Sequence, residues 1–527
     1  MNKRNLIRSL GIDKRGAELY YQFTPALPTD IREWLSNTEF DRIDAREADE
    51  VALFPIFHSH RYRTILFGLL AHALNYRGVG SVFVFGDGHF EACKGNLTDY
   101  EDKCVTCVKE SEALTSAMNL PVVFLDEFDY EGDVSPDVRT GLEKYARATT
   151  IYQLQTAQLD SDDDAQMDLL SRFTDTASEA WNAVEALDAE YDFDYVVSTG
   201  SVYAPRGAAI EYASRNDIPI TAFSDPANGT SGNEFLVGRM DGPRLQYLSG
   251  DAWEWLKSDP LSSEQVEQVD AYMTEKMETD RHLRFSNPDE SIETDADTEL
   301  YSMYTHLPWD AAIAGRSHPF SDQYEWVTET IRAFREFPER ELVVKVHPGE
   351  KLYGTNESMS EIIDSRFDTL PDNVRVLPAD TDVNPYTLIR ASDVVLVFRS
   401  TVGMEATYLG VPVITASNGH YAHRGFTYDP ETTERYVEYL ESGRESLTVT
   451  DEMQSLLCRY LYNFVFERPI DFPFVTQEPR QGEWHLRDLH SIDQLKPEGN
   501  DVLDELCTAI IDNTSYFYTK THETFQS

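Results

Sequence analysis

Short apolar runs alternate with amphipathic segments through the first half of the chain. An unbroken apolar run, such as the first one at residues 51–57, is typical of a strand that is covered on both faces. The segment after the first run, residues 58–78, has apolar residues at helical spacing and ends at a glycine. The alternation predicts βαβ units that build a parallel sheet. The runs are VALFPIF (51–57), SVFVFG (81–86), PVVFLDEF (121–128), DYVVSTGS (194–201) and IPITAFSD (218–225).

The same pattern starts again near residue 300, after an acidic, polar and mostly helical stretch over residues 259–298. We therefore predict an α/β fold with two Rossmann-like domains, parallel sheets and an acidic helical bridge. The later runs are LYSMYTH (300–306), ELVVKV (341–346), NVRVLP (373–378), SDVVLVF (392–398) and VPVITA (411–416). The predicted ranges are 1–245 for the first domain, with a Cys/His insert at 86–110, 246–298 for the bridge, 299–500 for the second domain and 501–527 for a C-terminal helix.

The charge of the chain is extreme, with 93 acidic against 45 basic residues and a formal net charge of -48. Such a charge causes self-repulsion at low ionic strength, and molar salt screens most of it. We therefore expect a halophilic protein, archaeal in type. Direct nucleic-acid binding is disfavoured, because a phosphate backbone recruits basic rather than acidic surfaces.

Cysteine content and hydropathy bear on where the protein works. Five cysteines in 527 residues do not form a disulfide scaffold, which favours the reducing cytoplasm. We expect neither a signal peptide nor a spanning helix, because no apolar stretch has the required length. The aromatic segment Leu457–Val475 is expected to be core. Peripheral contact with the inner face of the membrane stays the alternative.

Three of the five cysteines lie close together in the predicted insert. A C-x2-C spacing suits a tetrahedral structural Zn²⁺ or an Fe–S cluster, although no second such pair exists. Three buried small side chains or a labile disulfide are the alternatives. The candidate metal ligands are His89, Cys93, Cys104 and Cys107.

The strand ELVVKV in the second half carries a lysine and leads into His-Pro. Lys345 is costly within a central strand unless it is paired or faces a ligand. His347 stands at the carboxyl end of the strand, where parallel sheets bind ligands, and Pro348 fixes the exit of the loop. A histidine with only a structural role is the alternative.

A second strand end carries hydroxyl groups at the start of a helix. Ser400 and Thr401 follow SDVVLVF, where free backbone N–H groups favour an anion. Gly403 allows another group to come close, and Glu405 lies one turn later, within reach of ribose hydroxyls. An ordinary N-cap with a solvated glutamate is the alternative.

These motifs resemble a known family. A [K/R]-x-H-P strand end, an S-T-x-G-x-E-A helix start and two Rossmann domains are similar to GT-B glycosyltransferases of the capsule polysaccharide biosynthesis type, most closely over residues 300–430. The resemblance implies a nucleotide-sugar donor bound by the second domain, with residues 379–385 flanking the base. The implied donor-binding residues are Lys345, His347, Pro348, Ser400, Thr401, Gly403, Glu405, His420, Tyr421 and Arg424.

The first domain would then hold the acceptor and the catalytic base. His58 and Asp87 are the candidate bases, and His347 is expected to assist the leaving phosphate. His60 and Arg61 are candidate acceptor-binding residues. Further acidic candidates, which could equally cap helices or turns, are Asp126, Glu127 and Asp225.

The predicted function is therefore transfer of a sugar from a nucleotide-sugar to a saccharide or lipid-linked saccharide acceptor in surface polysaccharide synthesis. The lysine, the histidine and helix N–H groups would replace a metal at the donor site. A sugar-nucleotide epimerase and a polyol-phosphate transferase are enzymatic alternatives. A non-catalytic glycan-binding or scaffold module is the alternative from another class.

Overall fold

The protein is described from a computed structural model, in which the chain divides into two compact units. Unit 1 comprises residues 1–150, 161–249 and 465–527, and unit 2 comprises 151–160 and 250–464. The described residues are 21, 24–58, 60–86, 88, 90, 92–93, 101–125, 132–156, 158–200, 202–224, 235–241, 244–246, 248, 250–279, 287, 290, 292, 298–310, 319–478 and 483–514.

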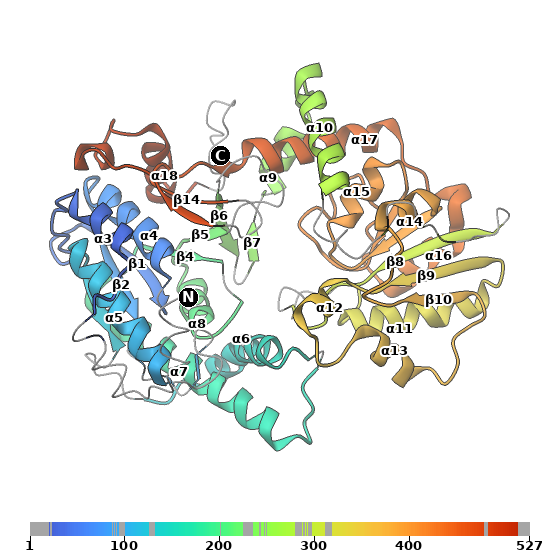
Figure 1. Cartoon of the computed structure of the whole chain (residues 1–527), viewed down its shortest axis with the longest axis horizontal. Coiled ribbons are helices and arrows are strands. Elements are labelled where there is room, and N and C mark those ends of the chain that lie inside the picture. The colour runs from blue at the N-terminus through green and yellow to red at the C-terminus, as the bar shows by residue number, and fades with distance from the viewer. Residues whose placement is uncertain are drawn as a thin grey trace. The chain divides into compact units, whose positions relative to one another are not determined.

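Unit 1 is built on an eight-stranded sheet with a parallel centre. Its central order is β3-β2-β1-β4-β5, so the first strand lies in the middle and the order reverses between β1 and β4 (Figure 1). Strands β6, β7 and β13 continue the sheet in antiparallel pairing. The bounds are β1 Glu50–Phe57, β2 Val79–Phe85, β3 Val122–Phe124, β4 Tyr195–Thr199, β5 Ile220–Ser224, β6 Phe235–Asp241, β7 Arg244–Gln246 and β13 Pro469–Ile470.

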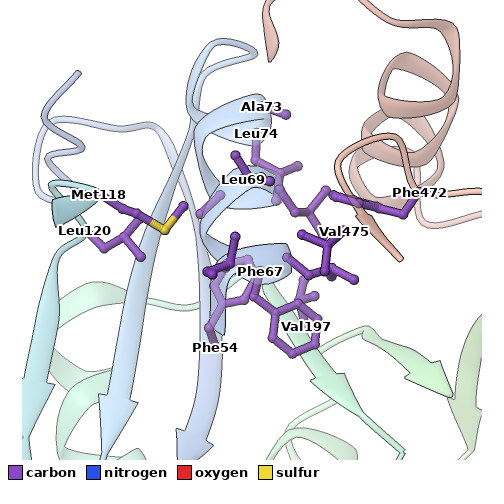
Figure 2. Packing of buried hydrophobic residues seen from close by; sticks show 14 of the residues in the cluster. Phe54, Phe67, Leu69, Ala73, Leu74, Met118, Leu120, Val197, Phe472 and Val475 are labelled. Atoms are coloured by element: carbon purple, nitrogen blue, oxygen red, sulfur yellow. The ribbon is translucent and has the colours of Figure 1, made fainter. Parts of the chain in front are cut away.

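Helix α4, Arg61–Asn75, is the centre of the unit 1 core, because it is buried along nearly its whole length. Figure 2 shows Phe67 of α4 beside Phe54 of β1, with Val475 of the C-terminal segment also close to this helix. Helix α18, Asp501–Ile511, also packs on α4. The other described helices of this unit are α3 Thr29–Ser36, α5 Glu101–Ala117, α7 Asp164–Tyr191 and α8 Arg206–Arg215, while α6 Pro136–Leu154 starts in unit 1.

The C-terminal segment therefore returns to unit 1, which differs from the predicted range 299–500 for one continuous second domain. Pairing of β13 with β6 and a hydrogen bond from Arg468 to the Val237 carbonyl hold it there. The small sheet of β14 (Val475–Gln477) and β15 (Trp484–Leu486) follows. The apolar side chains of the aromatic segment, such as Phe472 and Phe474, are core residues.

Unit 2 has a five-stranded sheet in the order β10-β9-β8-β11-β12, and every pairing is parallel. Here too the first strand is central and the order reverses beside it, between β8 and β11. Register pairs Tyr304 with Lys345 and with Val397, so the carboxyl ends of three strands meet at one edge. The bounds are β8 Glu299–Tyr304, β9 Arg340–Lys345, β10 Val374–Leu377, β11 Val394–Val397 and β12 Val413–Thr415.

Helices cover both faces of the unit 2 sheet (Figure 1). Helices α11 (Gln323–Ala333) and α13 (Met359–Arg366) lie on one face, and α14 (Pro385–Ala391) and α15 (Val402–Tyr408) on the other. The predicted α/β class with two Rossmann-like domains and parallel sheets is thus confirmed. Other helices of this unit are α9 Gly250–Leu256, α10 Ser263–Thr279, α12 Gly349–Tyr353, α16 Thr433–Ser446 and α17 Asp451–Tyr462.

From residue 250 onward the described part of the predicted bridge belongs to unit 2, where α10 packs against α17, while residues 246–249 belong to unit 1. Among the described residues, no helix has the length and apolar character needed to cross a membrane.

Candidate functional site

Lys345 is the last residue of β9 and is buried, with 6% of its surface exposed. Its side chain leaves the sheet on the same face as that of Val343, toward α14 and α15. Within the described part of the chain it makes no hydrogen bond or ion pair. Burial lowers the pKa of its ammonium group to about 8. A buried ammonium without an anionic partner is costly, so this position is suited to a ligand that brings negative charge.

His347 follows β9 and has a fixed orientation. Its backbone N–H donates to Thr305 Oγ1 at 3.1 Å, and its Nδ1 accepts from the Gly349 N–H at 3.0 Å. Accepting at Nδ1 leaves the ring proton on Nε2. A Cβ on Gly349 would lie 2.8 Å from Nδ1, so only glycine permits this contact. Pro348 directly precedes α12, and the turn that it starts holds Nδ1 of the His347 ring in a hydrogen bond with the backbone. Nε2 is therefore the ring atom that can donate to a ligand.

The second predicted motif lies at the end of β11, on the same sheet edge. Ser400 Oγ accepts from the Val402 N–H at 3.2 Å, and the Thr401 hydroxyl donates to Glu405 Oε1 at 3.2 Å. Glu405 is 3% exposed, and its Oε1 lies 3.3 Å from Lys276 Nζ. The glutamate that was expected to meet ribose is therefore engaged in a buried ion pair.

The loop after β12 contacts the same motif. The Tyr421 hydroxyl donates to the Ser400 carbonyl at 2.5 Å, and a Cβ on Gly403 would lie 2.2 Å from that hydroxyl. Gly403 thus admits a tyrosine of the protein itself. His420 Nδ1 lies 2.7 Å from the Tyr460 hydroxyl. Burial, with the nearby cations Arg399 and Arg424, lowers the pKa of His420 to about 4, which keeps its ring neutral.

Arg424 and the 379–385 segment, which the resemblance placed near the donor, also belong to unit 2. Arg424 lies over the ring of Trp253, with its guanidinium carbon 5.9 Å from the ring centroid. In the 379–385 segment, Asn384 caps α14 by accepting from two backbone N–H groups. The structure thus gathers Ser400, Thr401, Gly403, Glu405, His420 and Tyr421 in one cluster. Lys345 and His347 stand at the end of β9 on the same sheet edge, with the end of β8 between them and this cluster.

In unit 1, the described candidates stand between β1 and α4. His58 follows β1, and His60 caps α4 by accepting from the Arg63 N–H at 3.4 Å. Arg61 forms an ion pair with the buried Glu110 of α5. Its charge is therefore already balanced, which weakens the case for Arg61 as an acceptor-binding residue. Candidates outside the described residues are Asp87, His89, Asp126, Glu127 and Asp225.

The cysteines Cys93, Cys104 and Cys107 are not joined in disulfide bonds and are of intermediate exposure. Among the residues that the structure describes, no group of three or more His, Cys, Asp or Glu side chains could hold a metal ion. Since His89 lies outside them, the predicted ligand set stays a prediction.

Sequence reasoning missed three residues at these strand ends. His306 follows β8 and stacks on His347 with ring centroids 6.0 Å apart. Lys276 sits in the acidic α10, and nothing local in the sequence marks it as the partner of Glu405. Glu350 directly follows the His-Pro-Gly sequence, is 4% exposed, and accepts from the Met359 N–H at 3.2 Å. The signal available in the sequence was its position two residues after the His-Pro motif.

Glu350 gives a prediction for the pH dependence of stability. Burial raises the pKa of its carboxyl from 4.5 to about 7, so the folded protein binds more protons than the unfolded chain between these values. Stability contributed by this group is therefore lost as pH rises through that window. Glu350→Gln should gain about 3 kcal/mol over wild type at pH 8 and little near pH 4. Urea unfolding at both pH values measures this, with the exposed Glu336→Gln as control. A gain that does not depend on pH would contradict it.

Comparison with known proteins adds a family match. Residues 322–460 match the family described as "Capsule polysaccharide biosynthesis protein". The matched segment contains β9, β11 and both strand-end motifs, in agreement with the resemblance seen in the sequence. No curated protein sequence matches the chain significantly.

Solved structures show only distant likeness. The KpsC beta Kdo 2,4 transferase of Thermosulfurimonas dismutans is 18% identical over 57% of this chain and 87% of that chain, with a TM-score of 0.35. The UDP-GlcNAc 2-epimerase of Methanocaldococcus jannaschii is 11% identical over 78% of this chain and 98% of that chain, with a TM-score of 0.28. At these TM-scores we draw no conclusion from the likeness.

Proposed function

Because residues 322–460 match the capsule polysaccharide biosynthesis family, we propose that the protein is a glycosyltransferase of polysaccharide synthesis. It would transfer a sugar from a nucleotide-sugar to a saccharide or lipid-linked saccharide. The observation that carries the proposal is the buried ammonium of Lys345 at the carboxyl edge of the unit 2 sheet, which has no ion-pair partner among the described residues. A donor phosphate at that edge would supply the missing negative charge.

The chemistry requires stabilisation of the departing phosphate. Charge on the phosphate grows toward the transition state, so Lys345 and the Nε2–H of His347 would contribute more there than in the ground state. The acceptor hydroxyl also needs a base, for which His58 and Asp87 of unit 1 remain our proposal. We further propose that donor binding needs no metal, since the lysine and the histidine supply the positive charge.

Three measurements test the proposal. A thermal-shift screen of UDP, CMP, GDP and dTDP sugars in molar KCl should identify a donor, because ligand binding raises stability. Nucleotide release should then depend on an acceptor and persist in EDTA, and it should fall in His347→Gln. Conversion of the nucleotide-sugar without an acceptor would indicate an epimerase. Release of a polyol phosphate would indicate a polyol-phosphate transferase, and binding without any turnover a scaffold module.

The cytoplasmic, halophilic and archaeal character of the protein is likewise our proposal, and its net charge of -48 gives a prediction. Below a few hundred millimolar KCl, self-repulsion should abolish the cooperative fold, because the Debye length grows as salt falls. Circular dichroism and melting curves at about 50 mM and about 2 M KCl measure this. Equal melting temperatures at the two salt concentrations would refute the halophilic character.

We also propose that unit 1 holds a structural metal. We expect about one equivalent of zinc or iron per chain, held by Cys93, Cys104, Cys107 and His89. Elemental analysis of the purified protein measures it, and Cys104→Ser should lose the metal while Cys458→Ser retains it. Metal-free protein with freely titrating thiols would show that these cysteines have another role.

A further inference from the structure

Arg206 occupies the place in unit 1 where the strand order reverses. It is the first residue of α8, and its guanidinium bridges the carboxyl ends of the two strands on either side of the reversal. Nη1 donates to Thr199 Oγ1 of β4 at 2.6 Å, and Nη2 donates to the Ile56 carbonyl of β1 at 3.2 Å. Parallel α/β sheets bind ligands at this point.

The start of α8 is held rigidly from the side. A Cβ on Gly207 would lie 2.2 Å from the ring of Tyr145, so α6 and α8 touch there. Thr149 Oγ1 accepts from the Ala204 N–H at 2.9 Å, just before the helix. The guanidinium is therefore preorganised, and little conformational entropy would be lost when it binds a ligand.

The charge of Arg206 has little compensation within the described part of the chain, where the Cys93 thiol is the group that raises its pKa. It makes no ion pair with any carboxylate in the described part of the chain, and part of its surface remains accessible to solvent. Burial and then the positive charge of Arg63 lower its pKa to about 10. The positive charge of Arg63 thus acts unfavourably on the Arg206 guanidinium, and a bound anion would offset this effect.

Arg63 is itself held in place. It lies in the first turn of α4, with its guanidinium carbon 5.9 Å from the centroid of the Trp484 ring. The His60 ring meets the same tryptophan at 5.1 Å. Both arginines therefore stand on fixed elements of unit 1. By contrast, Arg61, the arginine that the sequence suggested, is already paired with Glu110.

We propose that Arg206 and Arg63 form an oxyanion site that binds a carboxylate or phosphate of the acceptor. An arginine fork matches either group through two parallel hydrogen bonds. The proposal rests on the proposed function in assigning the anion to the acceptor. The acceptor would then be an acidic sugar or a phosphate-linked saccharide, and a neutral glycan would bind more weakly.

Isothermal titration with three small probes tests the site. Glucuronate carries the carboxylate, glucose 1-phosphate carries the phosphate, and glucose carries neither. The titrations use Lys345→Met protein, so that anion binding at unit 2 does not contribute. At least one of the two anions should bind more tightly than glucose. Arg206→Gln should weaken that binding at least tenfold, which corresponds to about 1.4 kcal/mol. Arg139→Gln, which removes an exposed cation paired with Asp175, should leave the affinity unchanged.

The outcomes separate this proposal from the proposed function. Glucuronate binding indicates an acidic-sugar acceptor, and binding of glucose 1-phosphate alone indicates a phosphate-linked one. Equal affinity in Arg206→Gln, or no preference for either anion over glucose, overturns the site but leaves donor turnover untouched. Should Arg206→Gln not fold, Arg63→Gln serves instead, with a threefold or greater loss expected and an unchanged affinity overturning the site. A nucleotide-sugar should bind Arg206→Gln with the wild-type affinity.

Discussion

Replacing Lys345 by methionine should lower kcat/KM for the cognate nucleotide-sugar about a hundredfold while making the folded protein more stable. The activity loss corresponds to about 2.7 kcal/mol of transition-state stabilisation, the scale expected for one charge-assisted contact to a leaving phosphate. The gain in stability arises because methionine fills a similar volume without a buried charge. A pKa lowered from 10.5 to about 8 corresponds to about 3 kcal/mol at neutral pH.

The pH dependence of stability provides a second check on Lys345. Between about pH 8 and 10.5 the unfolded chain binds more protons than the folded protein, so wild-type stability contributed by this group rises with pH. The advantage of Lys345→Met should therefore shrink over that range. Lys351→Met, which removes an exposed lysine near Asp380, should change neither quantity. A variant that is active and destabilised would make Lys345 a structural residue.

Removing the carboxylate of Glu405 should destabilise unit 2 by about 3 kcal/mol, because it leaves the charge of Lys276 buried without this partner. We expect this loss for Glu405→Leu in urea unfolding. The double variant Glu405→Leu with Lys276→Met should recover most of it, since replacing both partners of a buried pair by apolar groups is often neutral.

A second substitution at this position, Glu405→Gln, tests whether Glu405 also contacts ribose. In the ion-pair account, Glu405→Gln lowers stability and leaves the affinity for the donor nearly unchanged after correction for unfolded protein. A ribose contact would give the opposite result, with weaker donor binding and an unchanged free energy of unfolding. Titration of the donor and urea unfolding of the same variant distinguish the two.

The central strands could be predicted from sequence because each is an unbroken apolar run. The runs at residues 51–57 and 341–346 correspond to β1 and β9 almost residue for residue. Edge pairings could not be predicted in this way. The two residues of β13 pair with a strand more than 200 positions earlier, and no local pattern records such a contact.

The candidate site shows the same limit. The burial of Lys345 follows from its apolar neighbours, and the parallel pairing of β9 and β11 with β8 explains why their carboxyl ends lie on the same sheet edge. The partner of Glu405 lies on α10, and the close neighbour of Gly403 is Tyr421. Both contacts depend on tertiary packing. The motif therefore located Glu405 and Gly403 but did not indicate that each has a partner within the protein.

The return of the C-terminal segment to unit 1 has a consequence for biosynthesis. As the chain leaves the ribosome, α4 emerges long before Phe472, Val475 and α18, which cover part of its apolar surface (Figure 2). Unit 2 is made in between and can fold as soon as it is complete. The first unit to be synthesised is thus the last to be finished, and its nascent form exposes an apolar surface throughout translation of the second.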